Sequence, residues 1–126
     1  MRLIQVGLRA EDLDRADAFY RRLLDEQPTA RFDPPGLLFF DLSGTRLLLD
    51  TRAPASLLYL EVDDLHATVE RLRADGVHIE AEPHFIYQHE DDRLGPTGMQ
   101  EWQAFIHDSE GNLVGLAAQV NPASIP

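Results

Sequence analysis

The chain has 126 residues, 44% of them hydrophobic, and this length suits a single domain, residues 1–126, with a substantial core. Acidic residues outnumber basic residues by 22 to 11, and the net charge of −11 argues against binding to nucleic-acid phosphates or to an anionic membrane surface. No apolar run approaches the ~20 residues that span a bilayer, and the absence of cysteine excludes disulfides and thiolate metal sites. We therefore expect a cytoplasmic protein with neither a membrane nor a nucleic-acid partner.

Residues 2–50 have the pattern of a strand, a helix and three further strands. Alternation over residues 2–9 predicts the first strand, and Asp12 is the predicted N-cap of the helix. The apolar stripe of that helix is formed by Leu13, Ala16, Tyr20, Leu23 and Leu24. Three short apolar runs, separated by turn residues, predict strands at 28–32, 36–41 and 45–50.

Residues 57–119 repeat this order after a predicted linker at 51–56. A strand is predicted at 57–62, and Asp64 is the predicted cap of the second helix. The apolar stripe of this helix is formed by Leu65, Val69 and Leu72. The remaining strands are predicted at 77–88, 102–107 and 112–119, and a tail at 120–126. The irregular stretch 89–100 contains glycine and proline, and we expect it to form a flap over a pocket.

Two sequence phrases occur twice. The stretch Gln5–Leu13 matches Leu57–Leu65 at an offset of 52 residues, and Gly44–Leu49 matches Gly111–Leu116 at an offset of 67. Internal repetition of this kind indicates two similar modules in one chain. We therefore expect the functional site to lie between two modules.

The order of these phrases resembles the vicinal oxygen chelate superfamily, which includes glyoxalase I, extradiol dioxygenases, methylmalonyl-CoA epimerase and bleomycin-resistance proteins. The resemblance covers residues 2–119. The stretches that carry it are Asp12–Ala16 with Phe19 and Tyr20, Val62–Leu65, and Asp108–Leu113. It implies an α+β fold in which two βαβββ modules form a cupped, barrel-like mixed sheet with the helices outside. It also implies a homodimer.

Metal-binding members of this superfamily take one ligand from each of four strands, usually a His on the first strand of each module and a Glu or Gln on the last. The matching positions lie seven residues before each capping aspartate and four residues after each turn glycine, and they are Gln5, Leu57, Leu48 and Gly115. Only Gln5 has a donor atom, whereas divalent ions need oxygen or nitrogen ligands. We therefore expect the metal site to be lost and no cofactor to be bound.

An alternative is a metal site moved to other donors late in the chain. The donors there are His84, His89, Glu90, Glu101, Gln103 and His107. No two of them show a recognised metal-ligand spacing, and the other interpretation is that they are polar residues at the surface or at a cavity rim. Strand alternation predicts that His84, Ile86 and Gln88 point to one face, and Phe85 and Tyr87 to the other.

The positions that lost their donors predict an apolar cavity floor, roomy at Gly115, that suits a small organic molecule. Polar and aromatic side chains on the same strands and beside the flap complete the predicted site. The predicted ligand-binding residues are Gln5, Leu48, Leu57, Tyr59, His84, Tyr87, Trp102, Gln103 and Gly115. No catalytic residue is assigned.

Three functions remain as hypotheses. The leading one is a metal-independent protein of the glyoxalase and bleomycin-resistance type that binds a small organic molecule. The second is a lyase, isomerase or dioxygenase-type enzyme with an unconventional site, in which His84, Tyr87 or Glu101 acts as acid or base. The third is a structural interaction module with a filled core.

Overall fold

The computed structural model describes residues 5–93 and 95–124, so residues 2–4 of the first predicted strand lie outside the described residues. The chain divides into two compact units. The first consists of Met1–Leu58 with His107–Leu113, and the second of Tyr59–Ile106 with Val114–Pro126. The turn His107–Leu113 is therefore contributed by the second half of the sequence and folds with the first.

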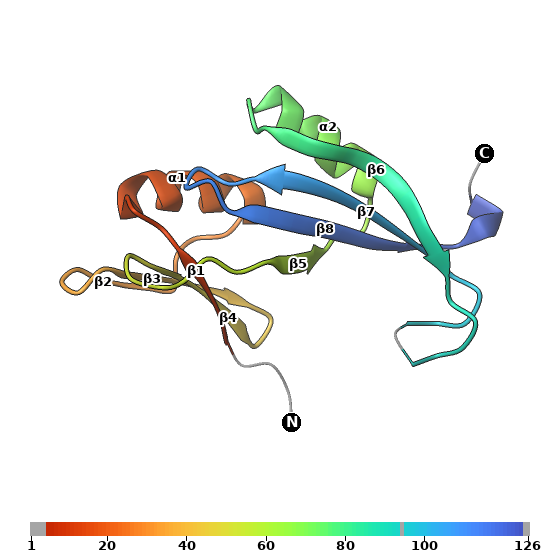
Figure 1. Cartoon of the computed structure of the whole chain (residues 1–126), viewed down its shortest axis with the longest axis horizontal. Coiled ribbons are helices and arrows are strands. Elements are labelled where there is room, and N and C mark those ends of the chain that lie inside the picture. Colours follow the sequence, from red (N-terminus) through yellow and green to blue (C-terminus); the bar gives the residue numbers. More distant parts are fainter. Residues whose placement is uncertain (1–4, 94, 125–126) are drawn as a thin grey trace. The chain divides into compact units, whose positions relative to one another are not determined.

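The first unit contains a four-stranded mixed sheet and one helix (Figure 1). Its elements are β1 (Gln5–Arg9), α1 (Leu13–Leu24), β2 (Ala30–Phe32), β3 (Leu37–Leu42) and β4 (Thr45–Asp50). The strand order is β1-β4-β3-β2, in which β1 is parallel to β4 and the other pairs are antiparallel. The βαβββ order predicted for this half is confirmed.

Helix α1 begins and ends where its local chemistry dictates. The side chain of Asp12 accepts a hydrogen bond from the backbone N–H of Arg15 at 3.0 Å, which satisfies one of the free N–H groups of the first turn. Asp25 ends the helix in a left-handed conformation (φ 52°), three residues before Pro28. The buried stripe consists of Leu13, Ala16, Phe19, Tyr20 and Leu23, whereas Leu24 is only half-buried.

The second unit repeats this arrangement. Its elements are β5 (Leu58–Glu61), α2 (Leu65–Ala74), β6 (Ile79–Gln88), β7 (Gln100–His107) and β8 (Leu113–Val120), followed by a short 3₁₀ helix (Pro122–Ser124). The strand order is β5-β8-β7-β6, which is the order of the first sheet, and β6 is therefore an edge strand. Figure 1 shows α2 running beside β6. The fold is α+β with two βαβββ modules, as predicted.

Helix α2 is capped in the same way as α1. The side chain of Asp64 accepts a hydrogen bond from the backbone N–H of Ala67 at 3.0 Å. The predicted stripe of Leu65, Val69 and Leu72 is buried. Gly76, with φ +81°, reverses the chain after the last turn, in a conformation that suits glycine.

The turn between β7 and β8 is built around the buried carboxylate of Asp108. Its Oδ1 accepts hydrogen bonds from the backbone N–H groups of Glu110 and Asn112, both at 2.8 Å. Its Oδ2 accepts from the hydroxyl of Tyr20 at 2.7 Å and from Nδ2 of Asn112 at 2.8 Å. Asn112 Nδ2 also donates to the backbone carbonyl of Arg9 at 2.6 Å. The Asp108 carboxylate thus joins the turn to α1, and the Asn112 amide joins the turn to β1.

An ion pair adds to this attachment at the start of α1. The Glu110 carboxylate accepts from the backbone N–H of Asp12 at 2.8 Å and from Nη2 of Arg15 at 2.9 Å. Burial raises the pKa of Glu110, but the hydrogen bonds from Arg15 and Asp12 outweigh it and hold the pKa below its ordinary value. The side chain of Glu110 is fully enclosed, although Arg15 is half exposed.

No helix in residues 5–93 or 95–124 is long and apolar enough to cross a membrane.

We predict that replacing Tyr20 with Phe lowers stability at neutral pH by roughly 1–2 kcal/mol, because Asp108 loses a donor. Burial, and then the Asp108 carboxylate, raises the pKa of Tyr20 well above its ordinary value of 10.0. The stability that Tyr20 contributes is therefore present below about pH 10 and is lost as the pH rises, because the unfolded chain ionises first. Urea denaturation of wild type and Y20F at about pH 8 and about pH 11 checks this. An equally steep loss in both proteins would contradict it, and Y59F, at an exposed tyrosine, is the control.

Candidate functional site

The second sheet has two chemically different faces. Side chains at alternate positions of β7 point to opposite sides. Trp102 lies toward α2, where its ring is 5.7 Å from that of His66, and Ala104 on the same side is fully buried. Gln103 and Phe105 therefore lie on the face away from α2. We call the face of the second sheet that points away from α2 the aromatic face. It consists of Tyr59, His84, Tyr87, Gln103 and Phe105.

Aromatic rings follow one another across this face. The Tyr59 ring meets the Phe105 ring edge to face at 5.8 Å, and the His84 ring lies 6.4 Å from Phe105 on the other side. His84 is also the cross-strand partner of Gln103. Tyr59 remains 51% exposed, which is unusual for a large ring inside such a cluster. The aromatic face therefore offers flat apolar surface with polar groups beside it.

The prediction that His84 and Tyr87 point to opposite faces was wrong. Strict alternation along β6 would separate them, but the register between β6 and β7 shifts between Phe85 and Tyr87. Phe85 pairs with Trp102, and after the bulge Tyr87 pairs with Glu101, which lies on the Gln103 side of β7. The extra residue of the bulge therefore brings Tyr87 onto the face of His84.

The roomy floor predicted at Gly115 was also wrong. A Cβ atom built on Gly115 would lie 2.5 Å from Cδ2 of Tyr59. The space that a side chain would occupy is therefore filled by the Tyr59 ring, which lies directly on the glycine backbone. Glycine at 115 is what allows the ring to lie flat on β8.

Trp102 lies on the opposite face of the second sheet from Gln103. Its ring meets Phe85 at 6.2 Å, and its Nε1 donates to Oε1 of Gln100 at 3.0 Å. It lines a pocket of about 580 Å³ at the start of α2. The residues around that pocket are Asp63, Asp64, Leu65, His66, Trp102, Val120 and Ser124. The structure thus brings Tyr59, His84, Tyr87 and Gln103 to one face and leaves Trp102 on the other.

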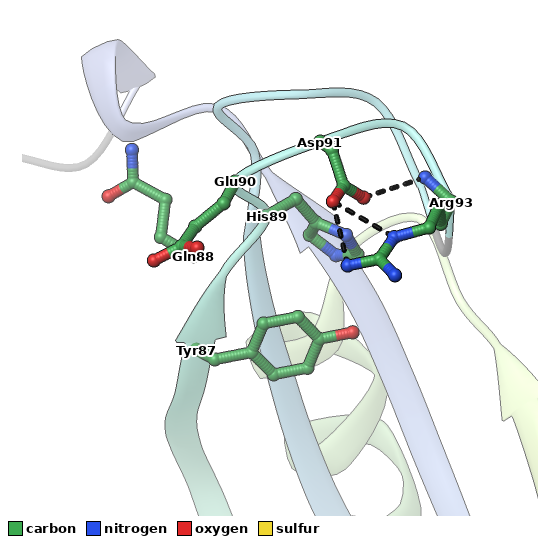
Figure 2. Close-up of a pocket in the computed structure, with 6 residues that line it drawn as sticks. All are labelled: Tyr87, Gln88, His89, Glu90, Asp91 and Arg93. Carbon is green, nitrogen blue, oxygen red and sulfur yellow. Dashed lines mark hydrogen bonds and ion pairs between the residues drawn. The ribbon is translucent and has the colours of Figure 1, made fainter.

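A second pocket, of about 500 Å³, lies where β6 runs into the stretch predicted to be a flap (Figure 2). It is lined by Tyr87, Gln88, His89, Glu90, Asp91 and Arg93. In Figure 2 the side chains of Tyr87, His89, Asp91 and Arg93 point to one side, whereas Gln88 and Glu90 point away from them. Asp91 accepts from the backbone N–H and Nε of Arg93, and this bonding lowers the pKa of Asp91.

The sequence named His89 only as one of several alternative metal donors, and its place in this pocket was not predicted. Its side chain is only 1% exposed, and its Nε2 lies 2.8 Å from Oε2 of Glu101. The Tyr87 ring packs on it with centroids 4.8 Å apart. A Cβ on Gly95 would lie 2.8 Å from Cε1 of His89, so the loop passes close over the ring. The sequence contains both partners as isolated donors, twelve residues apart, and nothing in that spacing predicts that they pair.

The predicted site residues of the first unit have their own surroundings. Gln5 pairs with Arg46 across β1 and β4, and its Oε1 accepts from Arg46 Nε at 2.9 Å. Leu48 is buried, and Leu57 is 47% exposed just before β5.

Comparison with known protein families matches residues 2–116 to the Glyoxalase/Bleomycin resistance protein/Dioxygenase superfamily. The match covers both modules and both capping motifs. The chain belongs to this superfamily.

Solved structures of glyoxalase-like proteins share the fold over nearly the whole chain. Lactoylglutathione lyase from Agrobacterium tumefaciens is 22% identical with a TM-score of 0.68, over 93% of this chain and 92% of that chain. TioX from Micromonospora sp. ML1 is 19% identical with a TM-score of 0.70, over 95% and 100%. A glyoxalase/bleomycin resistance protein/dioxygenase from Alicyclobacillus acidocaldarius is 15% identical with a TM-score of 0.68, over 99% and 96%. No curated protein matched the sequence.

The donor set does not fit the metal that many glyoxalase-type proteins hold. Three of the four matching positions, Leu48, Leu57 and Gly115, have no donor atom in their side chains. The fourth, Gln5, has its amide oxygen bonded to a guanidinium, and a positive charge at that distance opposes a second cation. The residues at these four positions therefore do not form a metal site.

We predict that Gly115→Ala destabilises the protein by roughly 1–3 kcal/mol, because its methyl group displaces the Tyr59 ring. In a Tyr59→Ala background the same substitution has little effect, since the clash is gone. Chemical denaturation of the wild type, both single variants and the double variant measures this coupling. Equal costs in the two backgrounds would show that the ring does not occupy the space above Gly115.

Proposed function

We propose that this glyoxalase-superfamily protein binds a small organic molecule without a metal. The observation that carries the proposal is the lack of donor atoms at Leu48, Leu57 and Gly115. Two leucine side chains and the hydrogen atom of a glycine stand where metal-binding members have donor side chains. A protein that keeps this fold and lacks the donors has no means of holding a cation at those positions, but it can hold an apolar ligand.

The aromatic face is the surface proposed to receive the ligand. Tyr59, Phe105 and His84 present ring surface, and Gln103 presents an amide that donates and accepts hydrogen bonds. Stacking on such rings contributes about 0.5–1.5 kcal/mol beyond the burial of area. This combination favours a flat ligand, partly aromatic, with at least one polar group at its edge.

The superfamily name supports a small organic ligand in general, because the superfamily includes bleomycin-resistance proteins. Gln5, Leu48, Leu57 and Trp102 remain proposed contributors from the sequence, with the aromatic face as the part supported by contacts. We also propose a cytoplasmic homodimer with neither nucleic acid nor membrane as a partner, in keeping with the net charge of −11.

A second candidate function is catalysis without a metal. The pairing of His89 with Glu101 favours it, because a carboxylate that holds an imidazole in one orientation is a common arrangement for a general base. Binding and turnover are distinguished by product analysis: a ligand released unchanged after long incubation supports binding alone.

Metal independence is tested by isothermal titration with Ni²⁺, Mn²⁺ and Zn²⁺. We expect no tight one-to-one binding, because three of the four matching positions lack donors. Chelator treatment is expected to leave the midpoint of thermal unfolding unchanged for the same reason. Tight stoichiometric binding of any of the three ions would refute the metal-independent part of the proposal.

Ligand binding is tested with Nile red, an uncharged aromatic dye whose emission rises in apolar surroundings. Replacing Tyr59 with Ala is expected to weaken binding roughly 2- to 10-fold, because one stacking partner is removed. The matched control is Phe32→Ala, which removes a ring that is 52% exposed in the first unit. Equal losses in the two variants, or none in Y59A, would count against the aromatic face.

A further inference from the structure

His89 is a buried imidazole in which Nε2 is bonded to Glu101, whereas Nδ1 is proposed to bind a ligand. Its Nε2 lies 2.8 Å from the Glu101 carboxylate, which only accepts hydrogen bonds when ionised. Nε2 therefore carries the ring proton, and in the neutral ring Nδ1 is an acceptor with a lone pair. The carboxylate fixes both the tautomer and the orientation of the ring.

The Nδ1 atom of His89 is the ring nitrogen without a hydrogen-bond partner among the described residues, and the ring lines the pocket. No described residue makes a hydrogen bond to it, whereas every fully buried side-chain nitrogen or oxygen in the described residues has a hydrogen-bond partner. The side chain as a whole is only 1% exposed, so a ligand would have to approach Nδ1 from the pocket that the ring lines. The volume of that pocket is about 500 Å³.

The wall beside Nδ1 favours an aromatic ligand. The Tyr87 ring lies 4.8 Å from the imidazole and lines the same pocket, so a second ring entering it meets an aromatic surface. Tyr87 reaches this position only because of the bulge in β6. A ligand that presents an O–H group at the edge of a ring would meet both the ring and the acceptor.

Charge in the pocket selects among hydrogen-bond donors. A carboxylate or phosphate ligand has no proton to give to Nδ1 and would face Glu101 behind it. An ammonium ligand would need a free carboxylate, but both Asp91 oxygens are engaged by Arg93, and Glu90 points away in Figure 2. An uncharged hydroxyl on an aromatic ring meets neither obstacle.

We propose that this pocket binds a phenol and that His89 removes its proton. The phenolic O–H bond breaks, and its electron pair stays on oxygen as phenolate. The proton forms a bond with Nδ1, and the resulting imidazolium lies between the phenolate and the Glu101 carboxylate. No oxidant, reductant or metal takes part, and atoms and charge balance within the three groups.

This inference goes beyond the proposed function, because the His89 pocket is separate from the aromatic face. Tyr87 is shared between the two, whereas Tyr59 belongs to the aromatic face alone. Experiments can therefore contradict the phenol site without contradicting ligand binding on the aromatic face, and the reverse also holds.

The test uses 4-nitrophenol, whose anion absorbs visible light and whose neutral form does not. The full-length protein is mixed with the probe at a pH below the point at which the free probe ionises. We expect a visible band from bound phenolate. The matched probe 4-nitroanisole has the same ring but no O–H, and it is expected to bind at least ten-fold more weakly. Equal binding of the two probes would overturn the proposal.

Variants separate the roles of the two side chains. Glu101→Gln keeps a hydrogen bond to His89 but removes the charge, and it is expected to lower the ionised fraction of bound probe about ten-fold. His89→Phe fills the same space and is expected to abolish ionisation. His66→Asn, which removes an imidazole on the other face of the sheet, is the control with unchanged ionisation. Circular dichroism of each variant excludes loss of fold as the cause.

Two results would contradict the proposal that His89 deprotonates a bound phenol. One is an unchanged phenolate band in H89F, and the other is a band that is lost equally in H66N. Tyr59→Ala, measured in parallel, is expected to weaken Nile red while leaving the phenolate band intact. Loss of Nile red binding with an intact band supports the phenol site by itself, and loss of the band alone overturns it without touching the aromatic face.

Discussion

The buried carboxylate of Asp108 organises the first unit, because four hydrogen bonds end on its two oxygens. Two come from the backbone of its own turn, one from Asn112 and one from the Tyr20 hydroxyl. A buried charge without partners would be strongly unfavourable, so each donor lowers the cost of burying this carboxylate. Through Tyr20 the turn fixes α1, and the buried stripe of α1 in turn covers the first sheet.

Local chemistry was readable from the sequence wherever neighbouring residues determine structure. Asp12 and Asp64 cap their helices as predicted, because a cap needs only a side-chain oxygen three residues before an N–H group. The repeated phrases predicted two βαβββ modules, since each module encodes the same order of turns and apolar faces. The family follows from those same phrases and is confirmed.

The candidate site was less readable, because it depends on register and on distant pairing. Alternation places His84 and Tyr87 on opposite faces, and only the bulge opposite Glu101 brings them together. Gly115 reads as an empty position in a sequence, but whether a ring from another strand fills it is decided in three dimensions. The partnership of His89 with Glu101 crosses a loop, and no local pattern encodes it.

The turn His107–Leu113 has a consequence for how this chain can be divided. The repeat suggests a cut in the linker at 51–56, giving two halves of similar design. A fragment that ended there would leave the Tyr20 hydroxyl and the Arg9 carbonyl without the groups that now satisfy them. The complementary fragment would carry a buried aspartate into water with nothing to hold its turn against. Repetition in the sequence therefore does not mean that the two halves can be separated at the linker, because Tyr20 and Arg9 find their partners in the other half of the chain.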